Sequence, residues 1–202
     1  KILNIPSLAI SQAQKEVLRM AGITKGMLKK SQEAMFTKDQ DLIEVVENEE
    51  SSVDELHHLL DDYLTRISSQ VITKEESQKL AILLHAVTDI ERVADHANNL
   101  AEISEFKIKN KINFSDSAEK KLNMMFSKVI DSFSCAIKSL DKNSQEIAQK
   151  TLSLENEVNR LEEKLRQSHY SRLKEGICQP EAGPIYLEIL MNLERISDHS
   201  EN

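Results

Sequence analysis

The sequence predicts an all-α protein made of two tandem antiparallel three-helix bundles, related by an internal pseudo-twofold repeat. Two observations support this prediction. The 202 residues include only 4 Gly, 3 Pro and 4% aromatic residues, a composition that lacks the turn and aromatic signals of sheets and favours helix. The segments 91–99 and 194–202 both fit Glu-Arg-x-x-Asp-His-x-x-Asn and begin 103 residues apart, which indicates a tandem duplication.

Apolar residues at helical spacing predict three helices in the first half of the chain. Pro6 and Ser7 suit a helix start, and the apolar stripe that follows extends from residue 8 to about residue 36. A second stripe covers about 41–68. Thr73, with Glu76 three residues later, predicts a capping box at the start of a third helix over about 74–106.

The second half repeats this order. A helix over about 115–140 is followed by a break at 141–143, and the next helix covers about 144–175 with Gly176 as its expected C-cap. The loop 179–184, with two prolines and a glycine, precedes a last helix from about 184 to the end. The two repeats are therefore 1–110 and 111–202. We expect the last helix to continue past residue 202, so that the second repeat is truncated at its C-terminus.

Charge and composition narrow the function. The formal net charge is −8 and no long Lys/Arg run occurs, which argues against nucleic-acid binding and favours interaction with cations. No apolar run approaches the roughly 18 residues of a membrane span, and no signal peptide is evident. Cys135 and Cys178 form no Cys-x-x-Cys pair, which is typical of a reducing compartment.

The repeated motif places acids in rows, because residues four apart share a helix face. The two rows are Glu91, Asp95 and Asn99, and Glu194, Asp198 and Asn202. A helical wheel puts these acids in the middle of the apolar stripe. Like charges and desolvation would destabilise that arrangement. Three alternatives could compensate: a metal ion bound by the carboxylates, ion pairs of Arg92 and Arg195 with acids on a neighbouring helix, or a position at a solvated edge of the bundle.

Other residues are weaker candidate ligands. Glu50 and Glu155 occupy equivalent positions on the middle helices, 105 residues apart, and His96 and His199 follow the acids. Asn99 and Asn202 end the two rows. Carboxylates with occasional imidazole suit Fe, Zn, Mn or Mg. His57 and His58 have no counterpart in the second repeat, and we interpret them as surface residues.

No catalytic motif or nucleophile is evident, so no catalytic residue is assigned. The chain is predicted not to be an enzyme. An enzyme that uses a dinuclear metal site in a helical bundle remains an alternative.

The segment ERVADHANN, repeated as ERISDHSEN, resembles the recurrent signature of the PhoU family, bacterial proteins that regulate phosphate uptake. The resemblance covers essentially the whole chain. Residues 3–21, LNIPSLAISQAQKEVLRMA, resemble the junction and first helix of the PhoU-like region that follows the membrane part of bacterial sodium/phosphate cotransporters.

The resemblance implies two three-helix bundles packed side by side, with metal bound through Glu91, Asp95, Glu194 and Asp198. It further implies a cytoplasmic, often oligomeric protein that acts on membrane transport machinery. We therefore expect a cytoplasmic regulatory domain of a sodium-dependent phosphate cotransporter, attached to the inner membrane through a transmembrane region before Lys1. Its partner would be that transport domain or a separate phosphate transporter. The alternative is a stand-alone accessory regulator of phosphate transport and signalling.

Overall fold

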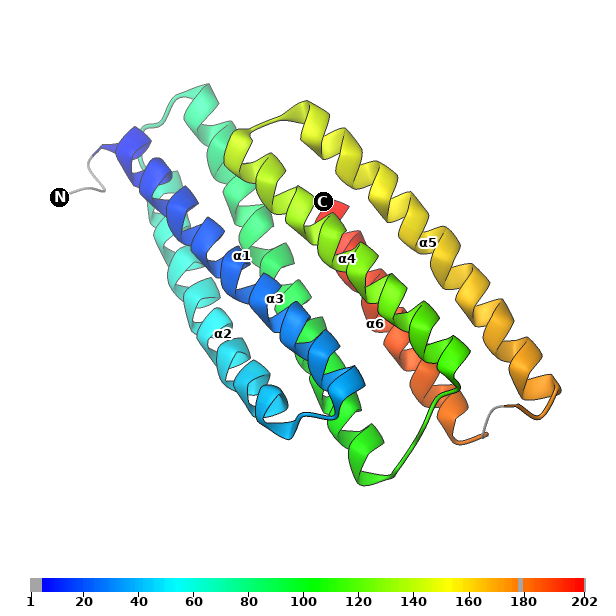
Figure 1. Cartoon of the computed structure of the whole chain (residues 1–202). Helices are drawn as coiled ribbons and strands as arrows, with labels where there is room; N and C mark the ends of the chain where they lie inside the picture. Colours follow the sequence, from blue (N-terminus) through cyan, green and yellow to red (C-terminus); the bar gives the residue numbers. More distant parts are fainter. Residues whose placement is uncertain (1–4, 178–179, 202) are drawn as a thin grey trace.

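The computed structural model describes residues 5–177 and 180–201, which form six α-helices and no strand (Figure 1). The helices are α1 (Pro6–Thr37), α2 (Gln40–Ser68), α3 (Lys74–Lys109), α4 (Asp116–Lys142), α5 (Gln145–Lys174) and α6 (Ala182–Glu201). All six lie where the sequence predicts a helix, so the all-α prediction is confirmed. None of these helices combines the length and the apolarity needed to cross a membrane.

Caps fix the helix boundaries. Thr73 Oγ1 accepts a hydrogen bond from the Glu76 backbone N–H (3.2 Å), and Glu76 Oε2 accepts one from the Thr73 backbone N–H (2.8 Å). The predicted capping box is therefore present. At the end of α5, Gly176 has a φ of +69° and the Ile177 backbone N–H donates to the Arg172 carbonyl (2.9 Å). This is a Schellman motif, in which glycine takes the left-handed position that ends the helix.

The helices pack as two bundles that share one hydrophobic core. Helices α1, α2 and α3 form the first bundle and α4, α5 and α6 the second, while α3 packs on α6 and α1 on α4 (Figure 1). All six helices contribute buried apolar residues to a single cluster. Phe36 of α1 meets Phe126 of α4 edge to face, with ring centroids 5.9 Å apart. The repeats therefore pack against each other through apolar contacts.

The acids of the motif lie at the edge of the buried helix face, whereas the helical wheel placed them in its middle. The side chains of Glu91, Asp95 and Glu194 are 14%, 34% and 34% exposed, while Val87 and Ala94 of α3 are almost completely buried. The reason is tertiary. Because α3 packs on α6 as well as on α1 and α2, the buried arc of α3 is wide and its centre is turned away from the acids.

Candidate functional site

A group of three potential ligands lies between α2 and α3 of the first bundle. Asp54 and His57 are three residues apart and therefore share one face of α2, and Glu91 faces them from α3. One potential ligand atom from each residue lies within 4.8 Å of the other two. Two oxygens and an imidazole nitrogen at this separation make a ligand set that suits a transition-metal cation.

Buried polar atoms in this group have no hydrogen-bond partner among the described residues. They are Glu91 Oε2 and His57 Nδ1. The Arg92 guanidinium lies nearby, with Nε 3.5 Å from Glu91 Oε2 and Nη1 3.3 Å from Asp95 Oδ2, but Arg92 is more than half exposed. A buried polar atom without a partner destabilises the fold by about 1–3 kcal/mol, so the site is suited to a further cation.

Electrostatics in the first bundle favour added positive charge. Burial, and next the carboxylate of Asp95, raise the pKa of Glu91, and Arg92 offsets this only in part. Burial, followed by repulsion from Asp54 and Asp95, raises the pKa of Glu50. Ionisation of both carboxyl groups is therefore unfavourable. A bound cation would stabilise their ionised forms.

On the corresponding face of α5 in the second bundle, an arginine already supplies positive charge. At the 105-residue offset, Asn159 and Glu162 replace Asp54 and His57. Arg166 forms a close ion pair with Glu162, and its Nε donates to Glu162 Oε1 at 2.8 Å. The two repeats therefore differ: the first offers Asp and His on the middle helix, and the second offers an amide and a neutralised glutamate.

The acids of the motif in the second bundle still repel one another. Burial and then Asp198 raise the pKa of Glu194. Burial, then Glu201, and further Asp198 raise the pKa of Glu155. Asn159 donates a short hydrogen bond to Glu155 and stabilises its ionised form in part. These residues form a second acidic row, but no His/Cys/Asp/Glu group with ligand spacing occurs there among the described residues.

The two motif histidines lie at the contact between the bundles. His96 Nδ1 is 2.9 Å from Asn192 Oδ1, and His199 Nδ1 is 2.9 Å from Asp89 Oδ1. The two imidazole rings stack, with centroids 5.9 Å apart and planes inclined by 27°. Asp89 and Asn192 are 103 residues apart, as are the histidines, so each repeat supplies the same two positions to a reciprocal pair. The side-chain contacts between the bundles therefore follow the pseudo-twofold symmetry of the repeat.

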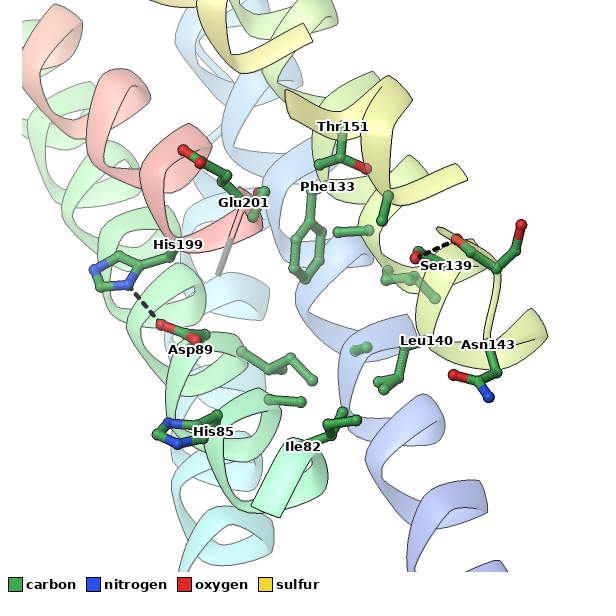
Figure 2. Close-up of a pocket in the computed structure, with 18 of the residues that line it drawn as sticks. Ile82, His85, Asp89, Phe133, Ser139, Leu140, Asn143, Thr151, His199 and Glu201 are labelled. Atoms are coloured by element: carbon green, nitrogen blue, oxygen red, sulfur yellow. Dashed lines mark hydrogen bonds and ion pairs between the residues drawn. The ribbon is translucent and has the colours of Figure 1, made fainter. Parts of the chain in front are cut away.

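A cavity of about 380 Å³ adjoins this contact, between α3, α4, the start of α5 and the end of α6 (Figure 2). Ile82, Phe133 and Leu140 contribute apolar walls. Figure 2 shows the contact between Asp89 and His199 on one side of the cavity. The cavity therefore joins an apolar interior to a polar inter-bundle contact.

The profile of the PhoU domain matches residues 17–104 and 122–202 of the chain. The chain belongs to the PhoU family. It is 25% identical, over 189 residues, to the phosphate-specific transport system accessory protein PhoU homolog 1 of Thermotoga maritima, an alignment that covers 93% of this chain and 80% of that protein.

Two further comparisons extend the match. The chain is 19% identical to YjbB of Salmonella typhimurium, whose name refers to inorganic phosphate export, over 96% of this chain and 36% of that protein. The crystal structure of PhoU from Pseudomonas aeruginosa has a TM-score of 0.90 to this chain at 18% identity, covering 97% of this chain and 93% of that one. This likeness shows the PhoU fold of two three-helix bundles.

In this PhoU-family chain the predicted metal ligands fall into three groups. Glu50, Glu91 and Asp95 line the first acidic row, Glu155, Glu194 and Asp198 line the second, and His96, Asn99 and His199 lie at the α3–α6 contact. Asn202 lies outside the described residues. Two residues of the Asp54–His57–Glu91 group, Asp54 and His57, were not among the predicted ligands, and His57 was expected at the surface. It is half-buried beside Glu91, whereas His58 is exposed as expected. The Asp-x-x-His spacing of Asp54 and His57 was the signal for it.

Proposed function

We propose that this chain is a cytoplasmic accessory regulator of a phosphate transport system and acts by binding, not by catalysis. The observation that supports this most is the PhoU-domain match over both repeats, together with relatives named for accessory and regulatory roles in phosphate transport. The T. maritima relative is covered over 80% of its length, which favours the stand-alone type.

The fused type is the second candidate. A domain attached to a phosphate transporter is favoured by the N-terminal segment 3–21 and by YjbB, of which the chain spans 36%. The coding sequence upstream of Lys1 distinguishes the two types: apolar spans there favour the fused domain, and a nearby start codon favours the stand-alone protein. We also propose that the chain can form a homo-oligomer. Light scattering of the purified protein tests this by measuring its molar mass.

Phosphate uptake tests the regulatory role. The chain is expressed in a bacterium from which the PhoU gene has been deleted, and radiolabelled phosphate uptake is measured. We expect uptake to return toward the parental level. A Leu28→Asp variant, which places a charge at a fully buried position and should not fold, serves as the control. Uptake that is identical with and without the wild-type chain contradicts the proposal.

We further propose that the first bundle binds one transition-metal cation through Asp54, His57 and Glu91. The buried atoms Glu91 Oε2 and His57 Nδ1, which lack hydrogen-bond partners among the described residues, fit such an ion. Imidazole in the ligand set favours Fe, Mn or Zn over Mg. Asp95 and Glu50 would add negative charge beside the ion.

Elemental analysis of protein purified without chelator tests this site. The His57→Ala variant should lose the metal, whereas Glu162→Ala, the matched change in the second bundle, should retain it. The double variant Asp95→Ala with Asp198→Ala measures how much the motif acids contribute. Equal metal content in wild type and His57→Ala would remove His57 from the ligand set.

A further inference from the structure

A buried arginine near the end of α5 has no anionic partner among the described residues. Arg172 is only 8% exposed. Its Nη1 donates to Ser168 Oγ at 2.8 Å, while Nε and Nη2 are buried and make no hydrogen bond. These two atoms form the edge of a guanidinium that grips a carboxylate or phosphate in bidentate fashion.

The cost of this arrangement is large. An unpaired buried charge is strongly destabilising, because the protein does not replace the hydration that the charge loses. The Tyr186 ring, whose centroid lies 5.4 Å from the Arg172 guanidinium carbon, provides a cation–π contact, which is weaker than an ion pair with an anion. A bound anion would supply the missing stabilisation.

The fold itself does not require these polar residues. In the first repeat, Leu64 and Ile67 occupy the positions of His169 and Arg172 at the 105-residue offset, and both are completely buried. Apolar side chains therefore fill the same place in an equivalent bundle. The second repeat carries an imidazole and a guanidinium at these positions.

A pocket of about 200 Å³ lies beside Arg172, where the end of α5 meets the beginnings of α4 and α6. Its volume is several times the roughly 30 Å³ that one water occupies in the liquid, so a small anion fits together with water. Ser115, the N-cap of α4, lines the pocket, and the partial positive charge of a helix N-terminus favours an anion there.

His169 provides a second buried polar group at the pocket. The residue is 1% exposed, and its Nε2 has no hydrogen-bond partner among the described residues. A Cβ added to Gly183 would lie 3.2 Å from this nitrogen, so glycine keeps the space beside it open. Burial and then the charge of Arg172 lower the pKa of His169. The neutral imidazole can carry its proton on Nε2 and donate it to an anion.

We propose that this pocket binds a small oxyanion, which the Nε–Nη2 edge of Arg172 holds with support from His169 and the α4 N-terminus. The ligand class is inorganic phosphate or a carboxylate. Lys121 adds positive charge nearby, since its Nζ donates to the same Ser168 hydroxyl at 3.1 Å. The inference does not rest on the proposed role in phosphate transport or on the metal site.

Thermal unfolding in different anions tests the site. The purified chain is melted in phosphate, sulfate, acetate and chloride at matched ionic strength. An anion that binds the folded state raises the unfolding midpoint with its concentration. We expect the wild-type midpoint to rise more in an oxyanion than in chloride. Phosphate and sulfate stabilise most folded proteins because they are excluded from the surface, so the ligand is identified from the part of each rise that an Arg172 variant loses. A loss in phosphate and sulfate identifies a tetrahedral ligand, and a loss in acetate identifies a carboxylate.

Arg172→Ile introduces the residue that the first repeat carries at this position. The variant should lose the oxyanion-specific rise, with an affinity at least about tenfold weaker by calorimetry, and its midpoint in chloride should not fall. Lys174→Met removes one exposed charge from the same helix and should keep the rise. If circular dichroism shows that Arg172→Ile does not fold, His169→Leu replaces it. Equal midpoints of the wild type in oxyanions and chloride, or a full rise in the folded variant, would overturn the proposal.

Discussion

Replacing Glu91 with glutamine is expected to stabilise the metal-free protein, although most substitutions at half-buried positions destabilise. Glutamine keeps the shape of the side chain and removes its charge. In the wild type this charge faces Asp54 on α2 and Asp95 one turn further along α3. Glu91 Oε2 accepts no hydrogen bond from any described residue, so the substitution breaks no such bond at this atom.

The magnitude follows from the geometry. Two unit charges separated by the 4.8 Å that bounds the Asp54–His57–Glu91 group repel by about 3.5 kcal/mol at an effective dielectric constant of about 20, and by about 1 kcal/mol in water. The Asp54 side chain is 53% exposed, so the value in water is the closer one. Attraction to Arg92, 3.5 Å from Glu91, cancels part of the repulsion. We therefore expect Glu91→Gln to raise the free energy of unfolding by about 0.5–1 kcal/mol.

Urea unfolding with chelator present, at low ionic strength, measures this gain as a function of pH. The pKa of Glu91 is raised in the folded state above its ordinary value of 4.5. Wild-type stability should therefore increase as the pH falls through the raised pKa toward 4.5, because the folded state binds the proton more tightly. Glutamine does not titrate, so the advantage of the variant is greatest at neutral pH and disappears as the pH approaches 4.5.

Two further measurements complete the test. Glu105→Gln is the control, because that carboxylate already pairs with Lys109 at 2.7 Å and its removal should give no gain. With metal added, the order should reverse, since only the wild type retains the full ligand set and gains binding free energy. A destabilised Glu91→Gln at neutral pH, or a gain that does not depend on pH, would refute the electrostatic reasoning.

Three other predictions concern the fold and are checked by urea unfolding. Phe126→Ala should cost about 3–5 kcal/mol, and a double-mutant cycle with Phe36→Ala should give a coupling of about 1 kcal/mol for their edge-to-face contact across the bundles; additive effects would contradict that contact. Thr73→Ala removes the capping box of α3 and should cost about 1 kcal/mol, so an unchanged midpoint would count against it. Lys111 has a φ of 52° just after α3, and Lys111→Gly should stabilise by about 1 kcal/mol; an unchanged or lower free energy of unfolding would contradict backbone strain at this residue.

The sequence predicted much of the fold and one of the three residues of the candidate site, Glu91. Six helices and their order follow from local periodicity, and the duplicated motif identified Glu91 and Glu194 directly. His57 was expected at the surface because the comparison between repeats gave weight to residues that recur, and His57 does not recur; in the structure it is half-buried. The Asp-x-x-His spacing places Asp54 and His57 on one face of α2, but the proximity of His57 to Glu91 depends on the approach of α3 to α2, which is a tertiary contact.

The histidines of the motif show the same limit. Their helical position indicated only that they point away from the acid row. The stack of His96 on His199, and their contacts with Asn192 and Asp89, arise because α3 and α6 pack together. Contact between helices about 100 residues apart in sequence is a property of the folded chain.

By itself, the sequence determined the helical class, the duplication and the residues available for chemistry, because helix propensity, capping and periodicity are local. The tertiary structure decided which of those residues meet. It turned the acids to the edge of the core, paired Glu162 of the second bundle with Arg166, and buried Arg172 beside a pocket. These outcomes depend on helix packing, since burial and charge pairing are set by neighbours that lie far apart in the chain.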